Sequence, residues 1–294
     1  TASASFAFRV RTIGTSRLIE AAFLCPYAEG CAFPMESRLS QPESEARFAS
    51  RETDAADMRA IQEFLDEALV SEVLNVIKSG KEATVYRCRA DPSLGVDFAA
   101  AKVYHSANHR SFQRSAVYEE GRQFGPGQVQ RAIKNRSEFG REAQLAFWVE
   151  HEFEVLSALH YAGADVPAPF ACTEKAILME FVGDEDGDSP QLQYARFADD
   201  EAEKVLERIL WNIELMVREN VVHGDLSAFN MLYHEGQVRI IDFPQAVDPR
   251  KNSSARDLLQ RDISNVVEFF QRRRAGLERE PERMARNLWN LWKY

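Results

Sequence analysis

The spacing of hydrophobic residues divides the chain into helical stretches and short strand-like runs. Apolar residues at helical spacing predict four helices, over residues 58–69, 147–159, 202–217 and 258–270. Runs rich in β-branched and aromatic residues, bounded by Gly, Pro and Asp, predict strands over residues 73–77, 84–88, 98–103, 177–182, 231–233 and 238–241. The first three strands suit an antiparallel meander. Two lobes are expected to meet near Gly183.

Three segments fall outside this periodicity. Residues 1–57 offer little apolar surface to offset the entropy of ordering, so we expect a disordered N-terminal tail. Residues 105–141 are rich in Arg and Lys and contain Gly125-Pro126-Gly127, which indicates a basic, partly flexible insertion. The acidic run after Gly183 is interpreted as a solvated linker. The predicted domains are therefore an N-lobe over 58–182 and a C-lobe with C-terminal helices over 183–294.

Composition narrows the class of protein. The 294 residues are 45% hydrophobic and 28% charged, which is typical of a globular protein of one or two domains. No apolar run is long enough to predict a membrane span. The net charge of −10 argues against general coating of nucleic acid. Cysteines at 25, 31, 88 and 172 form no zinc-binding pattern, and reduced thiols in a cytoplasmic protein are expected.

The strongest chemical signal lies in the second half of the chain. His223-Gly-Asp-Leu-Ser-Ala-Phe-Asn230 is followed by Asp242 at the end of an apolar strand. This order is typical of phosphoryl transfer, in which Asn230 and Asp242 offer oxygen ligands to Mg²⁺ and Asp225 lies beside the acceptor. Each residue alone is equally consistent with a turn or a strand end. The full set at this spacing favours the catalytic interpretation.

A cation is expected on the opposite wall of the site. Lys102 ends the run Ala99-Ala-Ala-Lys-Val, a position from which an ammonium group can reach two phosphates. An isolated lysine there would more often extend to water. Glu152 is the candidate partner for Lys102, and Glu150 is the nearby competitor.

A loop between two predicted strands is a candidate phosphate loop. Its sequence is Ser79-Gly80-Lys81-Glu-Ala-Thr-Val-Tyr86, and its backbone is placed to lie over a nucleotide. A single glycine would ordinarily indicate only a hairpin turn. The loop also departs from the G-x-G-x-x-G pattern of ordinary protein kinases.

Together these motifs resemble the RIO family of atypical serine/threonine protein kinases, including its bacterial members. The resemblance covers residues 60–274 and keeps the motifs in order. The matching segments are Ser79–Tyr86, Lys102, Val166-Pro-Ala-Pro169, Met179–Gly183, His223–Tyr233, Ile240-Ile-Asp-Phe-Pro-Gln245, Arg261–Asn265 and Phe269-Phe270.

The resemblance implies a fold, a reaction and roles for individual residues. The implied fold class is α+β and kinase-like, with a small antiparallel-sheet N-lobe and a mainly helical C-lobe. The implied cofactors are ATP and Mg²⁺, with Mn²⁺ as a substitute, and the acceptor is serine or threonine on this chain or on another protein. The implied site residues are Ser79, Gly80 and Lys81 at the phosphate loop, Lys102 at the phosphates, Glu152 as its partner, the backbone of Glu180 and Val182 at adenine, Asp225 as catalytic aspartate, and Asn230 and Asp242 at the metal. Related members also accept phosphate at the position of Asp242, which implies an ATPase-like cycle.

The chain departs from these patterns at three points. Lys78 replaces a hydroxyl residue that is frequent at that position of the RIO loop, and Pro244 stands where ordinary kinases have a glycine. No A-P-E motif follows Asp242, and few residues remain after it. We therefore expect a shortened C-lobe without a full activation segment.

Other functions remain open at this point. Small-molecule phosphotransferases of the aminoglycoside or choline kinase type share the His-Gly-Asp and Ile-Asp-Phe patterns but do not explain the loop at 79–86. A nucleotide-binding scaffold with weak catalysis is a further alternative. The basic residues in 110–141 and Arg272–Arg274 suggest contact with RNA or a ribosomal particle, although such charges are more often a solvated face.

Overall fold

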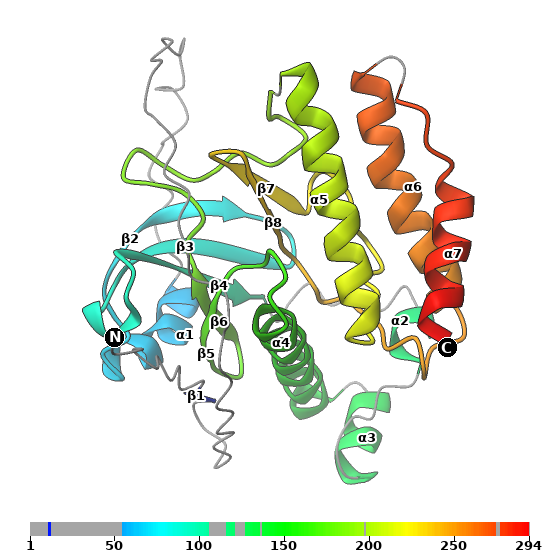
Figure 1. Cartoon of the computed structure of the whole chain (residues 1–294). Helices are drawn as coiled ribbons and strands as arrows, with labels where there is room; N and C mark the ends of the chain where they lie inside the picture. The colour runs from blue at the N-terminus through cyan, green and yellow to red at the C-terminus, as the bar shows by residue number, and fades with distance from the viewer. Residues whose placement is uncertain are drawn as a thin grey trace, which may run out of the picture.

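A six-stranded sheet and a helical region make up the computed structural model (Figure 1). The structure describes residues 11–12, 55–105, 116–120, 127–135, 137–196, 198–274 and 277–293. Most of the segment predicted to be a disordered tail lies outside these residues. Of that segment, Arg11–Thr12 forms strand β1 and residues 55–57 belong to the first helix.

The sheet has the strand order β1-β5-β6-β4-β3-β2. Its other strands are β2 (Val70–Ser79), β3 (Ala83–Ala90), β4 (Phe98–Tyr104), β5 (Pro169–Cys172) and β6 (Ala176–Glu180). All neighbouring pairs are antiparallel except β1 and β5. Strand β5 was not predicted from the sequence, and β6 ends before the predicted limit of 182. A 3₁₀ helix, Pro92–Leu94, lies between β3 and β4.

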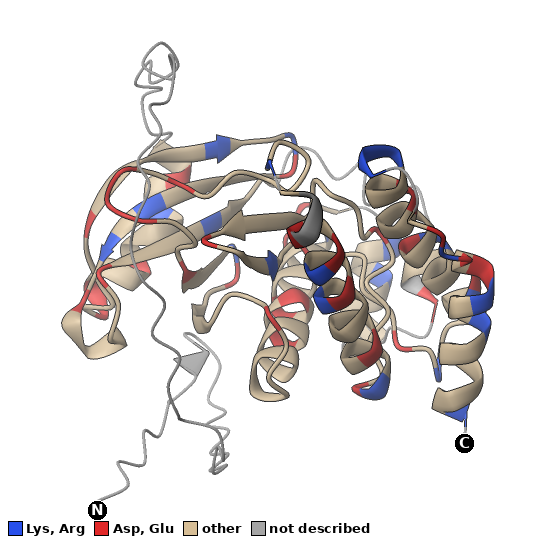
Figure 2. Ribbon diagram, turned by 45° about the horizontal axis from the view of Figure 1, so that its top comes forward, with Lys and Arg blue, Asp and Glu red and all other residues tan. Residues whose placement is uncertain are grey.

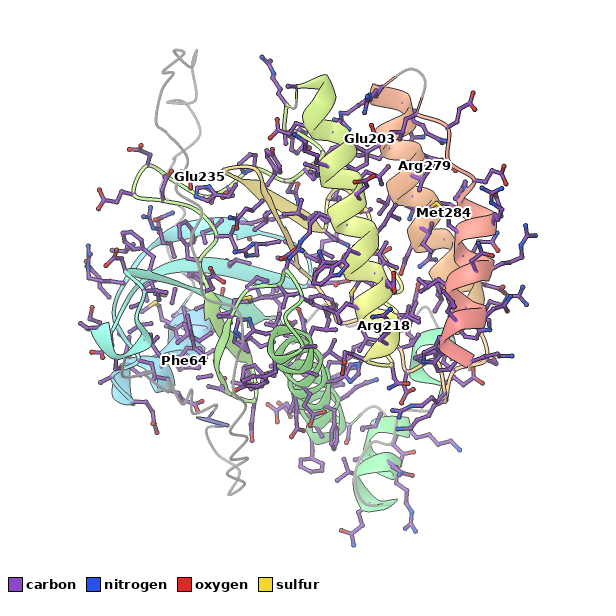
Figure 3. All side chains as sticks on the ribbon, viewed as in Figure 1. Phe64, Glu203, Arg218, Glu235, Arg279 and Met284 are labelled. Carbon is purple, nitrogen blue, oxygen red and sulfur yellow. The ribbon has the colours of Figure 1, made fainter. Side chains whose placement is uncertain are left out.

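Helix α1 (Ala55–Asp66) packs on one face of the sheet. Phe64 is fully buried there, among apolar residues of β3, β4 and β6, and Figure 3 labels it at this contact. The helix ends before the predicted limit of 69. Ala68 adopts a left-handed conformation with φ 53°, and the Leu69 N–H donates to the Phe64 carbonyl. These two features turn the chain into β2.

The region predicted to be a basic insertion contains two short helices. They are α2 (Ala116–Glu119) and α3 (Gly127–Lys134), and the rest of residues 106–126 lies outside the described residues. Helix α4 (Glu138–Tyr161) begins earlier than predicted, because Ser137 caps it by accepting a hydrogen bond from the Gly140 N–H at 3.0 Å. A Cβ at Gly140 would lie 2.1 Å from the Ala132 carbonyl oxygen, so the glycine allows α3 to approach α4.

The C-terminal lobe is built around three long helices. They are α5 (Asp199–Arg218), α6 (Ala255–Arg273) and α7 (Pro281–Lys293), and they share a large apolar core with the C-terminal half of α4. The hairpin of β7 (Met231–His234) and β8 (Gln237–Ile240) lies beside them. Glu203 on α5 pairs with Arg274 and Arg279 across this lobe (Figure 3). None of the described helices is long and apolar enough to cross a membrane.

Candidate active site

A cleft of about 630 Å³ lies between the sheet and the C-terminal lobe. Its walls come from β2, β3 and β4, from the segment after β6, and from the segments that flank the β7–β8 hairpin. The sequence-predicted residues that line it are Gly80, Lys81, Lys102, Glu152, Glu180, Val182, Asn230 and Asp242. The structure also describes Ser79 and Asp225, which are not among the residues that line the cleft.

Lys102 joins the two lobes across the cleft. Its Nζ atom donates to Glu152 Oε1 and to Asp242 Oδ1, each at 2.7 Å. The lysine comes from β4, Glu152 from α4, and Asp242 from the chain just after β8. Glu150, the competitor considered from sequence, is exposed. The structure therefore places Glu152 against the lysine.

The buried Glu152 carboxylate has three donors. Besides Lys102, the Tyr104 hydroxyl donates to Oε2 and the Phe243 N–H donates to Oε1 at 3.3 Å. Burial by itself would lower the pKa of Lys102, but the charges of Asp242 and Glu152 outweigh it and hold that pKa well above its usual value. The lysine is thus a permanent cation in the cleft.

Asp242 has an unusual backbone conformation, with φ 74°. This left-handed conformation is uncommon for a residue other than glycine and is often found at functional sites. The Asp242 side chain remains 45% exposed. Burial raises the pKa of its carboxyl. The Lys102 ammonium and other positive charges nearby lower it, and together they outweigh burial, so the pKa lies below its usual value. Asp242 is therefore ionised and open to the cleft.

The loop from His223 to Asn230 is held by internal hydrogen bonds. The Asn230 side-chain amide donates to the Asp225 carbonyl at 2.8 Å. His223 is buried, which lowers its pKa to about 4, and its Nε2 lies 3.2 Å from the Ile241 carbonyl oxygen. Because a carbonyl only accepts, neutral His223 donates from Nε2 and ties this loop to the segment that carries Asp242.

Asp225 itself is exposed at the edge of the cleft. Partial desolvation raises the pKa of its carboxyl, the nearby Arg261 charge opposes that rise, and Asp242 adds to it. The negative charge of Asp242 therefore acts on Asp225. A carboxylate with a raised pKa next to a cleft suits proton transfer from a hydroxyl group.

Asp262 contacts the loop that carries Asp225, although no role was predicted for it from the sequence. It is 1% exposed on α6, and its carboxylate accepts from the Gly224 N–H at 2.8 Å and the Leu226 N–H at 3.0 Å. These are the two amides that flank Asp225. The signal in the sequence was an acidic residue on the apolar face that also carries Leu258, Leu259 and Val266.

Helix α2 reaches the same loop from the other side. The Tyr118 hydroxyl donates to the Gly224 carbonyl at 3.1 Å, and Arg261 donates to both the Tyr118 hydroxyl, at 2.9 Å, and that carbonyl. Gly224 has φ 80°, and a Cβ there would lie 2.7 Å from the Gln245 carbonyl oxygen. Glycine is thus required for this close packing.

The polar groups of the cleft fit a divalent cation that is bound together with phosphate. Asn230 and Asp242 offer oxygen atoms from one wall. Among the described residues no group of three or more His, Cys, Asp and Glu side chains is arranged to hold a metal. Mg²⁺ is usually held by one or two protein oxygens with substrate phosphates and water, so this sparse set suits Mg²⁺.

Comparison with known proteins shows the same architecture. A crystal structure of the Rio2 kinase-ADP/Mg²⁺-phosphoaspartate complex from Chaetomium thermophilum matches with a TM-score of 0.58 and 21% identity, over 79% of this chain and 64% of that one. At this identity the match shows the fold alone. The sheet, the helical lobe and the cleft between them define a two-lobed protein of the kinase-like fold, as the sequence predicted.

Sequence comparison identifies the family. The family model of the RIO domain matches residues 84–283. RIO-type serine/threonine-protein kinase Rio1 of Haloferax volcanii is 31% identical over 233 residues, which are 76% of this chain and 72% of the relative. Serine/threonine-protein kinase RIO1 of C. thermophilum is 31% identical over 72% of this chain. The chain belongs to the RIO domain family.

The chain spans less than half the length of its fungal relatives. The match covers 42% of the C. thermophilum RIO1 kinase and 47% of serine/threonine-protein kinase rio1 of Schizosaccharomyces pombe, which is 28% identical over 83% of this chain.

Proposed function

We propose that this chain binds ATP with Mg²⁺ and acts as a RIO-type atypical serine/threonine kinase and ATPase. One observation carries the proposal. A permanently charged lysine from the sheet is paired with a buried glutamate and with an exposed aspartate of the other lobe, at 2.7 Å in each case, in a cleft large enough for a nucleotide. The kinase names of the relatives support it.

The adenine end of the nucleotide is assigned to the segment after β6. Glu180 and Val182 line the cleft there. The Val182 carbonyl accepts from the Ser189 N–H at 3.0 Å, whereas no hydrogen bond from the Val182 N–H is found within the described residues. The Val182 N–H is therefore available to donate to a ring nitrogen of adenine. The Glu180 carbonyl is expected to accept from the adenine amino group.

The phosphate end is assigned to the opposite part of the cleft. Lys102 and the loop at Gly80 and Lys81 would surround the phosphates, and Asn230 and Asp242 would hold Mg²⁺. The metal ion, when bound, neutralises phosphate charge. Asp225 at the edge would accept the proton of the acceptor hydroxyl as its oxygen attacks the γ-phosphorus and ADP leaves.

Two acceptors fit this site. A serine or threonine hydroxyl, on this chain or another protein, would be oriented by Asp225. Alternatively, an Asp242 carboxylate oxygen would attack the γ-phosphorus as the bond to ADP breaks and ADP leaves. Water would later hydrolyse the aspartyl phosphate, releasing inorganic phosphate and restoring the carboxylate. The phosphoaspartate named in the Rio2 structure supports considering this second route.

Incubation of the purified chain with γ-labelled ATP and Mg²⁺, followed by mapping of the label, tests the proposal. Label on serine indicates a kinase, and alkali-labile label at Asp242 indicates a switch-like ATPase. Asp225→Asn should suppress serine labelling and Asp242→Asn should suppress both. Transfer to kanamycin or choline instead would support a small-molecule phosphotransferase. Neither labelling nor hydrolysis by the unmodified chain would leave a nucleotide-binding scaffold.

The lobe boundary near Gly183 and the disordered tail remain proposals. We also propose a cytoplasmic location, supported by the free, buried thiols of Cys88 and Cys172, which suit a reducing compartment. Limited proteolysis and localisation of the tagged chain test these assignments.

Contact with RNA or a ribosomal particle is proposed through α3 rather than through the arginines at the end of α6. Arg131 and Lys134 lie in the last turn of α3. By contrast, Arg272 pairs with Glu268 and Arg274 with Glu203. In Figure 2 acidic and basic segments occur together on the C-terminal helices. Filter binding at low salt should show association that weakens as salt rises, and its absence would exclude the contact.

A further inference from the structure

Lys78 and Ser79 face opposite sides of the sheet. In the β2–β3 register Lys78 lies opposite Val85, and Ser79 lies opposite Thr84. Val85 and Lys78 line the cleft. The Ser79 hydroxyl is instead 3.3 Å from the Thr84 hydroxyl, which is 4% exposed and lies 2.9 Å from His105 Nε2. Because successive residues of a strand alternate between faces, Lys78 rather than Ser79 faces the cleft, and of the β2 residues that line it, Ile77 and Lys78, only the lysine carries a charge.

Lys78 differs from Lys102 in its ionic contacts within the described residues. Lys102 already has two carboxylate partners. Lys78 is exposed at the cleft, and no acidic group within 4.0 Å of it is found in the described part of the chain. Lys78 is therefore a cation near the phosphate end of the cleft.

The cleft needs such a cation when a nucleotide binds. Its lining already contains several acidic residues, among them Glu82, Glu152 and Asp242, and Asp225 lies close to Asp242. A polyphosphate adds further negative charge, only part of which a single Mg²⁺ offsets. An ammonium group has three donors and makes charge-assisted hydrogen bonds to phosphate that are stronger than those of a neutral hydroxyl.

We propose that Lys78 is a phosphate-binding residue, whose ammonium group contacts the polyphosphate of the bound nucleotide. This inference rests on the proposed function, because it assumes that the cleft takes a nucleoside triphosphate. Lys78 thus replaces the hydroxyl side chain that the RIO loop frequently carries with a charged one. Affinity in this chain should then depend on the number of phosphates and on ionic strength.

Calorimetric titration of the full chain with ATP, ADP and adenosine, each with Mg²⁺, tests the inference. Lys78→Ser should weaken ATP binding about tenfold, the loss expected for one charge-assisted hydrogen bond, and should leave adenosine binding unchanged. Lys78→Arg should retain most of the affinity. The control is Lys175→Ala, which removes an exposed lysine from the turn between β5 and β6, outside the cleft lining, and should change nothing.

The salt dependence gives a second measurement. Raising the salt concentration should weaken ATP binding more in the unmodified chain than in Lys78→Ser. Melting temperatures of the variants should match, because the side chain is exposed on β2. Equal ATP affinity of Lys78→Ser and the unmodified chain would overturn the inference, as would equal losses for ATP and adenosine. If the unmodified chain binds no nucleotide, the proposed function itself fails, which is a different result.

Discussion

The Nζ atom of Lys102 lies 2.7 Å from Oδ1 of Asp242, although 140 positions separate the two residues in the sequence. The contact brings a side chain of the sheet against one of the C-terminal lobe, and Glu152 completes it from α4. The lysine therefore bridges the two carboxylates. Contacts within the chain itself bring the three side chains together in the cleft.

Removal of Lys102 should affect stability and function separately. Lys102→Met leaves the buried Glu152 carboxylate without its cation and should lower the free energy of unfolding by about 3–5 kcal/mol. The double variant Lys102→Met/Glu152→Gln should recover much of that stability, because no buried charge remains. Urea unfolding measures the stability of the single and the double variant. The double variant should still lack ATP turnover, and equal destabilisation of the two variants would contradict the argument.

Substitution of Asp225 should affect turnover and spare binding. We expect Asp225→Asn to lower phosphate transfer to serine by about 10²–10⁴-fold, the usual contribution of a general base. ATP affinity and melting temperature should hardly change, since the side chain is exposed at the edge of the cleft. Single-turnover assays and calorimetry check this. Unchanged transfer would show that another group takes the proton.

Asp262 should give the chain a measurable dependence of stability on pH. Burial raises the pKa of its carboxyl from 3.8 to about 7, against the opposing effect of the Gly224 and Leu226 amides. The folded state therefore binds more protons than the unfolded state between these values. The contribution of Asp262 to the free energy of unfolding is complete below pH 4 and is lost as the pH rises through 7.

Asp262→Asn tests this sign. The amide can accept from only one of the two N–H groups, so at pH 4.5 the variant should be less stable by about 1–3 kcal/mol. The unmodified chain should lose about 2–4 kcal/mol relative to the variant between pH 4.5 and 7.5. The depressed pKa of His223 is common to both proteins and cancels. A constant difference across this range would show that Asp262 keeps an ordinary pKa in the folded chain.

Tyr118 should couple α2 to the catalytic loop. Tyr118→Phe removes the hydroxyl that lies between Arg261 and the Gly224 carbonyl, and should lower stability by about 1 kcal/mol. Because the backbone beside Asp225 is then less restrained, we expect kcat to fall with little change in KM for ATP. Tyr161→Phe, at an exposed tyrosine at the end of α4, is the matched control. A similar fall in both variants would argue against the coupling.

Local patterns in the sequence were sufficient for the elements and for the order of the motifs. The β7–β8 hairpin and helices α5 and α6 lie where apolar periodicity predicted them, because each buries one continuous face. The motif that runs from His223 to Asn230, with Asp242 after it, depends on spacing along a single stretch of chain. Such features can be predicted before any tertiary contact is known.

Contacts between distant elements could not be predicted in this way. Glu150 and Glu152 are both glutamates on α4, and only the packing of that helix against β4 decides which one meets Lys102. The β2–β3 register likewise decides that Lys78, and not the Ser79 side chain, lines the cleft. The sequence by itself determined the family, through residue types and spacing, and so predicted the proposed chemistry. Tertiary structure decided which side chains share the site, because their orientation is set by packing between segments far apart in the chain.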